Sequence, residues 1–122
     1  MGQTNWLVNF VSHGWLFEVM AIFRERSTIL DLTEHDFADF AEGLKRVFSY
    51  MDSKGIYSFN LNIYSGTSET AGHFWTYTRV VPPFIYSPVE ASDTAVGRIL
   101  HDWCFAFWNP EEVCTELKPY FK

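Results

Sequence analysis

The most constraining feature of this 122-residue sequence is a capped amphipathic segment near its middle. Thr33 is a favourable N-cap residue, and Asp36 three positions later completes a pattern of the capping-box type. Apolar side chains then recur at helical spacing, at Phe37, Phe40, Ala41, Leu44, Val47, Phe48 and Met51. Gly55 ends the pattern, because glycine commonly follows the last residue of a helix. We therefore expect a helix from Glu34 to Ser53 with one buried face.

Segments on both sides of this helix predict β-strands. Before it, residues 5–11 and 16–23 are apolar and rich in β-forming residues, and Ser12-His13-Gly14 between them is typical of a turn. These two strands can form a hairpin, and the strand at residues 5–11 offers an edge for further pairing.

Two more strands are expected after the helix, at residues 57–65 and 73–81. In the first, Phe59, Leu61 and Ile63 share one face, and the other face carries Ser58, Asn60, Asn62 and Tyr64. In the second, one face carries His73, Trp75, Tyr77 and Arg79, and Pro82-Pro83 ends the strand. If the two strands form a hairpin, the asparagine row and the row that starts at His73 line one face of the sheet.

The C-terminal part predicts two further helices. One extends from Asp93 to about Trp103, and the other begins at Pro110, capped by Asn109, and continues through Tyr120. The resulting order, β-β-α-β-β-α-α, favours the α+β class with an antiparallel sheet. The length is suited to one domain, residues 1–122.

Composition excludes several classes of partner. A net charge of −6 argues against a nucleic-acid-binding surface, which needs a basic patch. The longest apolar run, Val19 to Phe23, is too short to cross a membrane, and the first residues lack the pattern of a signal peptide. Cys104 and Cys114 lack metal-site spacing and are interpreted as reduced thiols of a cytoplasmic protein. We expect no metal and no cofactor.

Three segments together resemble a known superfamily: "FEVMAIF", "ILDLTEHDFADFAEGLKRVFSYMD" and "YSFNLNIYSG…HFWTYTRVVPP". Between about Trp6 and Pro83 the chain resembles the histidine-triad superfamily, most of all the C-terminal half of galactose-1-phosphate uridylyltransferases. The resemblance implies a histidine-triad-like antiparallel sheet with one long helix and short C-terminal helices. In that superfamily one strand carries alternating histidines, and the middle one attacks the α-phosphate of a nucleotide.

The alternating histidines are not present in this chain. The register that places the first of them on His73 puts Trp75 and Tyr77 at the next two positions. A second register, fixed by the Pro-Pro, puts a histidine pair of the uridylyltransferase C-terminal half on Tyr77 and Arg79. Neither register leaves a nucleophile, because an indole nitrogen is not basic. The chain also has no His-Pro-His, which the N-terminal, attacking half of those enzymes carries. The resemblance thus implies a half that supports a site, in a longer protein or free-standing, with no catalytic residue.

Six residues are candidates for binding a nucleotide or sugar phosphate: Asn60, Asn62, His73, Trp75, Tyr77 and Arg79. Asparagine is disfavoured in strands, so a pair of them indicates a role. Aromatic rings can stack on a base or sugar, or pack against another element or subunit. Arg79 can clamp an anion, and an ion pair with Glu18 is the alternative. His73 can contact phosphate or instead bond to the loop at residues 66–72.

Three functions stay open from the sequence. The first is an accessory domain that binds a nucleotide or sugar phosphate or packs on a catalytic half. The second is an active nucleotidyltransferase or nucleotide hydrolase that uses His73 in an altered geometry. The third is a module that dimerises through its aromatic sheet face. With aromatic residues at 19%, we expect a homodimer or an interface with a catalytic half, unless the segment from residue 84 covers the surplus.

Overall fold

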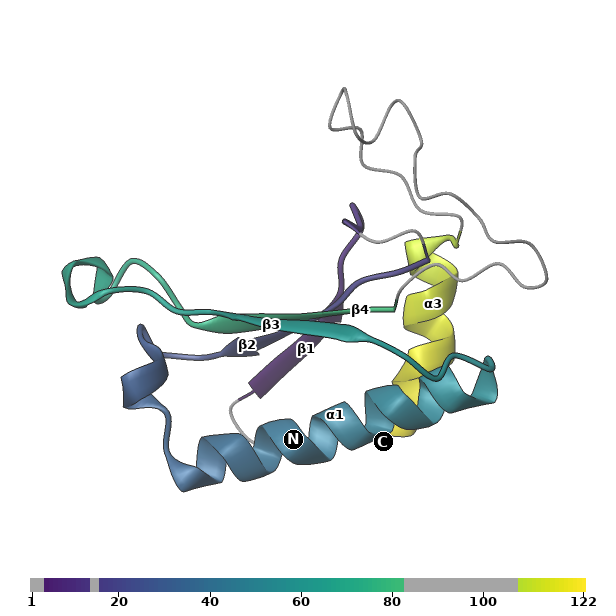
Figure 1. Cartoon of the computed structure of the whole chain (residues 1–122), viewed down its shortest axis with the longest axis horizontal. Helices are drawn as coiled ribbons and strands as arrows, with labels where there is room; N and C mark the ends of the chain where they lie inside the picture. Colours follow the sequence, from purple (N-terminus) through teal and green to yellow (C-terminus); the bar gives the residue numbers. More distant parts are fainter. Residues whose placement is uncertain (1–3, 14–15, 83–107) are drawn as a thin grey trace.

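The architecture is one antiparallel sheet with a long helix across one of its faces. The computed structural model describes residues 4–13, 16–82 and 108–122. Its strands are β1 (Thr4–Val8), β2 (Val19–Phe23), β3 (Asn60–Tyr64) and β4 (Tyr77–Val81), in the spatial order β1-β2-β4-β3. The helix α1 (Glu34–Ser53) runs beneath the sheet, and α3 (Pro110–Leu117) stands at one end of it (Figure 1). The α+β class with an antiparallel sheet is therefore confirmed.

The cap of α1 forms as predicted and is reinforced by a neighbouring arginine. The Thr33 hydroxyl accepts from the Asp36 N–H at 3.2 Å, and the Asp36 carboxylate accepts from the Thr33 N–H at 2.8 Å. Arg26 donates to the same carboxylate oxygen at 2.9 Å. Burial alone raises the pKa of Asp36, but the Thr33 hydrogen bonds and the Arg26 charge outweigh it and hold that pKa below its usual value. This cluster therefore fixes where the helix begins.

The strands are shorter than the sequence predicts, although each lies within or next to its expected segment. In the first, the strand ends at Val8, and Phe10 and Val11 are 71% and 52% exposed. In the last, Phe74 contacts the ring of Tyr77, with centroids 5.8 Å apart, so the predicted alternation between them fails. The pairing of β3 with β4 begins at Tyr64 opposite Tyr77, and of the described residues just before Tyr77 only Thr76 bonds to the other side, through the Phe23 N–H and the Arg26 carbonyl. The prediction that strand structure extends from His73 is wrong.

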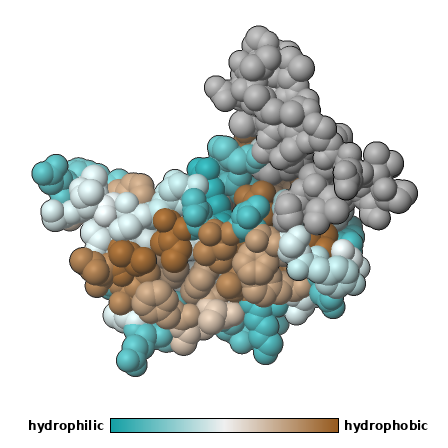
Figure 2. Space-filling model, viewed as in Figure 1, coloured by the Kyte–Doolittle hydropathy of each residue, from teal (hydrophilic) through white to brown (hydrophobic). Residues whose placement is uncertain are grey.

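The core lies between the sheet and α1. Its fully buried members come from β2, α1 and β4, and include Val19, Val47, Tyr50, Met51 and Val80. Trp6 of β1 stacks on Phe40 of α1, with ring planes 6° apart. The sheet covers the apolar stripe of α1 only in part, and Phe37 remains 47% exposed. Apolar side chains accordingly form a visible band between β3 and α1 (Figure 2).

The C-terminal helix begins as predicted, with the Asn109 side chain accepting from the Glu111 N–H at 3.0 Å. It ends at Leu117, and a 3-10 turn, η3 (Lys118–Phe121), completes the predicted span. Two shorter 3-10 turns, η1 (Ile29–Asp31) and η2 (Ser68–Thr70), lie in the loops. The predicted helix at residues 93–103 and Cys104 lie outside the described residues, whereas Cys114 is a free thiol. In the described part of the chain, every helix is too short or too polar to cross a membrane.

Candidate functional site

The sheet has one face that α1 does not cover, which we call the open face. In the pairing of β3 with β4, Asn62 lies opposite Arg79 and Tyr64 opposite Tyr77. Residues directly opposite each other project to the same face, and alternate residues share it, so Asn60 joins this group. The intervening positions, such as Leu61 and Val80, contact the core. The predicted common face of the asparagine row with Tyr77 and Arg79 is therefore confirmed.

A shallow cavity of about 340 Å³ lies on the open face. It is lined by His13, Asn60, Leu61, Asn62, Tyr64, Arg79 and Val81. The lining combines one guanidinium, two carboxamides and one imidazole, all of which can donate hydrogen bonds. Arg79 supplies the guanidinium of this cavity from β4, which lies between β2 and β3 in the sheet.

Arg79 is held by a buried carboxylate at the residue that precedes β2. Its Nε lies 3.3 Å from Oε1 of Glu18, whose side chain has no exposed surface. The guanidinium also lies over two aromatic rings of the open face, 5.0 Å from the centroid of Tyr64 and 5.5 Å from that of Tyr77. Those two rings stack on each other at 4.8 Å. An ion pair on one side and ring faces on the other restrict the guanidinium to one position.

Glu18 organises the loop that follows β1. Its Oε2 accepts from the backbone N–H of His13 at 2.8 Å and contacts the ring Nδ1 of His13 at 2.9 Å. Its Oε1 accepts from the side-chain amide of Asn9 at 3.0 Å. Burial alone raises the pKa of this carboxyl, but the bonds from His13 and Asn9 and the Arg79 charge outweigh it. The pKa of Glu18 therefore lies below its usual value, and the group is a carboxylate at neutral pH.

The same geometry assigns the tautomer of His13. A carboxylate only accepts, so Nδ1 carries the proton that it donates to Glu18. Arg79 Nη1 lies 3.4 Å from that protonated nitrogen, a contact in which neither atom can accept. The imidazole is thus fixed through Nδ1, and the ring remains largely exposed, with 53% of the side chain accessible. Its Nε2 is available to a ligand as acceptor or donor.

Two of the six predicted site residues lie apart from this cluster. His73 is an exposed turn residue whose backbone N–H bonds to the carbonyl of Thr70 at 3.0 Å, as in the loop-bonded alternative. Trp75 precedes the first residue of β4 and is 43% exposed. The expectation that both belong to the face of Tyr77 and Arg79 assumed strand alternation from residue 73, which the structure does not have.

Sequence reasoning missed three members of the cluster: Asn9, His13 and, except as a possible ion-pair partner, Glu18. His13 was interpreted as an ordinary loop residue. One signal could have identified the group, because Glu18 stands between Phe17 and Val19 in an apolar segment. A carboxylate in such a place needs several partners to remain charged. Among the described residues, no three His, Cys, Asp or Glu side chains lie close enough to hold a metal ion.

Comparisons with known proteins place this geometry in context. No family model matches the sequence. An uncharacterised protein of Archaeoglobus fulgidus is 23% identical over 116 residues, covering 95% of this chain and 34% of that protein. The chain thus spans about a third of the length of this curated relative.

Two solved structures are similar over almost the whole chain. A uridylyltransferase matches 98% of the chain with a TM-score of 0.73 and 19% identity, over 39% of its own length. An ADP-glucose phosphorylase from Arabidopsis thaliana, solved with bound ADP-glucose, matches 96% with a TM-score of 0.74 and 15% identity, over 37% of its length. Likeness at this identity shows the fold. The chain therefore shares its α+β fold, with one antiparallel sheet, with these two proteins.

Proposed function

We propose that this chain is an accessory, non-catalytic histidine-triad-like domain whose open face binds the phosphate of a nucleotide or sugar phosphate. The observation that carries the proposal is the restricted Arg79 guanidinium beside the carboxamides of Asn60 and Asn62 in one cavity. Guanidinium groups bind phosphate oxygens through paired hydrogen bonds, and carboxamides can add donors or contact sugar hydroxyls. The two similar structures, a uridylyltransferase and a phosphorylase with bound ADP-glucose, support the ligand class.

The non-catalytic part of the proposal rests on the side chains of β4. In the first register His73 keeps the first histidine position, but Trp75 holds the attacking one and Tyr77 the third, and the second register falls on Tyr77 and Arg79. None of these later positions, which lie in β4 or just before it, has an imidazole nitrogen. The ring of Tyr77 stacks on that of Tyr64 and lies under the Arg79 guanidinium, so we assign it a packing role in the site. A domain of this kind contributes binding and leaves bond cleavage to another half or chain. That partner is part of the proposal.

A matched pair of charge changes tests the binding site. Asn62→Asp places a carboxylate beside Arg79, whereas Asn5→Asp places the same charge on the open face at the β1 edge, three strand spacings from Asn62. That separation, roughly 14 Å for three strand spacings, exceeds the Debye length of about 8 Å at physiological salt. Both positions are exposed, so neither change threatens the fold.

The measurement is the affinity for uridine monophosphate, glucose 1-phosphate and inorganic phosphate by NMR titration. We expect Asn62→Asp to weaken binding by at least about fivefold, the equivalent of about 1 kcal/mol, and Asn5→Asp to leave it unchanged. Equal effects of the two variants, or no binding of any probe at millimolar concentration, would overturn the proposal. Binding of inorganic phosphate as tight as that of the two organic phosphates would limit the site to the phosphate group.

A second candidate function is favoured by one observation, the pair of His13 with Glu18. A buried carboxylate that fixes Nδ1–H of a histidine leaves Nε2 as the nucleophilic or basic atom, here beside a cationic Arg79. In such a reaction Nε2 would attack phosphorus, and the leaving group would depart with the electrons of the broken P–O bond. This moves the enzymatic alternative from His73, which lies in an exposed turn, to His13.

His13→Gln separates the two functions. Gln cannot form the phosphorus–nitrogen adduct, but it retains a hydrogen-bonding side chain near Glu18. If His13 is a nucleophile, a nucleotidyl adduct on the wild-type chain, detected by mass spectrometry after incubation with a nucleotide-sugar, disappears in this variant. If the domain only binds, no adduct forms in either protein and ligand affinity changes by less than about tenfold.

A further inference from the structure

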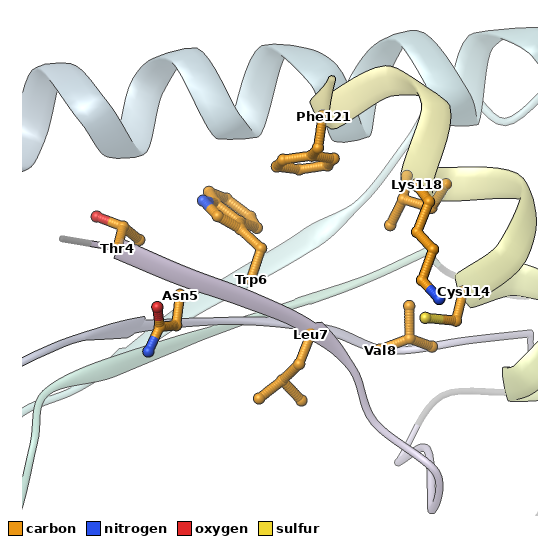
Figure 3. Close-up of a pocket in the computed structure, with 9 residues that line it drawn as sticks. Thr4, Asn5, Trp6, Leu7, Val8, Cys114, Lys118 and Phe121 are labelled. Carbon is orange, nitrogen blue, oxygen red and sulfur yellow. The ribbon is translucent and has the colours of Figure 1, made fainter. Parts of the chain in front are cut away.

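The second edge of the sheet has a groove beside it, away from the open-face cavity. A cavity of about 400 Å³ follows the whole of β1, from Thr4 to Val8, and its other wall is formed by Cys114, Leu117, Lys118 and Phe121 of α3 and η3 (Figure 3). A second cavity of about 340 Å³ shares Val8, Cys114 and Lys118 with it and extends to Phe10 and Pro110. The two form one continuous groove between a strand edge and a helix.

The backbone of β1 presents hydrogen-bonding groups to this groove. The Asn9 N–H bonds to the Glu18 carbonyl at 2.8 Å, in register with the β1–β2 pairs. Bonded and non-bonded residues alternate in an antiparallel pair, so Leu7 and Asn5 also bond toward β2, whereas Val8, Trp6 and Thr4 point away from it. The Thr4 N–H confirms this, because it donates to the Asp39 carboxylate at 3.1 Å. Within the described residues, β1 is the last strand on its side.

We propose that this groove binds an extended peptide segment of a partner protein, which adds to β1 as a further strand. Trp6 and Val8 each present one N–H and one C=O to the groove, and a strand is the conformation that pairs with such a row. A peptide strand that pairs with β1 lies along its free edge, next to the side chains of α3 and η3 that line the groove. A second copy of this chain would bring its own α3 and η3 alongside its β1, against the same wall.

The walls of the groove specify the chemistry of the segment. The two peptide residues opposite Trp6 and Val8 are two positions apart, so both project to the side of the sheet on which Trp6 and Val8 lie. The peptide residue opposite Trp6 faces Phe121 and Leu117, and the ring centroid of Phe121 is 5.6 Å from that of Trp6. We therefore expect this peptide residue to be apolar. The one opposite Val8 lies beside the exposed Lys118 ammonium and is acidic. The recognised pattern is an apolar and an acidic residue separated by one residue.

The probes are two acetylated pentapeptide amides, Thr-Glu-Thr-Val-Thr and Thr-Val-Thr-Glu-Thr, which present the pattern in antiparallel and parallel directions. The control of the antiparallel probe carries N-methyl groups on its Glu and Val nitrogens, and that of the parallel probe on the nitrogens of its third and fifth residues, so that neither control can donate to the β1 carbonyls. We expect one probe to shift the amide resonances of Trp6, Val8 and the residues of η3, and its N-methylated form to bind at least about fivefold more weakly.

Two variants of the protein complete the test. Lys118→Glu reverses an exposed charge and should weaken binding of the Glu peptide by at least about fivefold, while a Lys-for-Glu peptide should bind this variant better than wild type. Val8→Pro removes an N–H that does not bond to β2, a position where edge strands tolerate proline, and should abolish binding. Val8→Thr, which keeps that N–H, should bind more tightly than Val8→Pro.

Three results would overturn the proposal. The first is the absence of any shift in β1 at millimolar peptide from a folded protein. The second is equal binding of the N-methylated and parent peptides. The third is protection of the Trp6 and Val8 amides that rises with protein concentration without peptide, which would assign the groove to a second copy. None of these three results depends on the proposed phosphate binding, which is placed on the open face of the sheet and is tested separately by Asn62→Asp.

Discussion

The Nε of Arg79 lies 3.3 Å from Oε1 of Glu18, and this contact joins β4 to the segment that leads into β2 beneath the open-face cavity. The carboxylate is fully buried and is also bonded by Asn9 and His13. The cation of the candidate site is therefore positioned by the fold before any ligand arrives, which lowers the entropic cost of binding.

The first prediction concerns this pair and its dependence on pH. The pKa of Glu18 is lower in the folded than in the unfolded chain, so its carboxylate stabilises the fold above the ordinary value of 4.5. That stabilisation is lost as the pH falls through the lowered value. Glu18→Gln should reduce the free energy of unfolding at pH 7 by about 3–5 kcal/mol, because it leaves Arg79 without its partner.

Denaturant titrations at several pH values measure this effect. The variant should show less acid destabilisation than the wild type below pH 4.5. Glu69→Gln, which changes an exposed glutamate in η2, should stay within about 0.5 kcal/mol of wild type. A loss below about 1 kcal/mol for Glu18→Gln would show that the pair contributes little.

The second prediction concerns Gly43, which lies against Trp6 in the middle of α1. A β-carbon at this position would overlap the indole ring. In a helix interior, alanine is normally more favourable than glycine by about 1 kcal/mol. Here the alanine β-carbon must displace Trp6 from its stack on Phe40. We expect Gly43→Ala to destabilise the fold by about 1–3 kcal/mol in denaturant titration. Ser49→Ala, at an exposed position of the same helix, should be neutral or stabilising, and the same result for Gly43→Ala would contradict the contact.

The third prediction concerns the buried phenol of Tyr50. Its hydroxyl donates to the Glu116 carboxylate at 3.0 Å. Burial raises the pKa of the phenol above its ordinary 10.0, and the Glu116 carboxylate raises it further. The unfolded chain therefore ionises first, and stability falls as the pH rises above that value. Tyr50→Phe should cost about 1–2 kcal/mol at pH 7 and reduce the alkaline loss. Tyr57→Phe, at an 83% exposed tyrosine, is the control and should change neither quantity.

The fourth prediction is that the chain forms no nucleotidyl adduct and hydrolyses no nucleotide above background. The side chains at the expected histidine positions, Trp75, Tyr77 and Arg79, provide no nucleophile, and His73 lies in an exposed turn. Intact-mass spectrometry after incubation with UDP-glucose or ADP-glucose checks this. An adduct on His13 would favour the second candidate function, and an adduct on His73 would restore the earlier enzymatic alternative.

The fifth prediction concerns assembly with a second copy or a catalytic half. An apolar strip of α1 and β3 remains partly exposed, and includes Phe37, Leu44, Phe48, Phe59 and Ile63. The strip borders β3, which is an edge strand among the described residues. Sedimentation at micromolar concentration should show a species larger than 14.2 kDa, or one that grows when a catalytic half is supplied. A species of 14.2 kDa that persists at tenfold higher concentration and with that half present would contradict the prediction.

Local patterns predicted the elements whose stability is local. The capping pair of Thr33 and Asp36 and the spacing of apolar residues fixed α1 to the residue at both ends. Asn109 and Pro110 did the same for the start of α3. Strand ends were overestimated, because alternation continues in the sequence beyond the point where a partner strand stops. For this reason His73 and Trp75 were assigned to a strand that begins only at Tyr77.

The sequence by itself determined the α+β class, the capped helix and the common face of Asn60, Asn62, Tyr77 and Arg79, because all of these follow from the period of the side chains along one chain. Only the tertiary structure decided that Glu18 is buried with Asn9, His13 and Arg79, and that β1 borders a groove with α3. These contacts join distant segments, such as Trp6 and Phe121, which are 115 positions apart, and their formation depends on how the sheet and helices pack rather than on any local pattern.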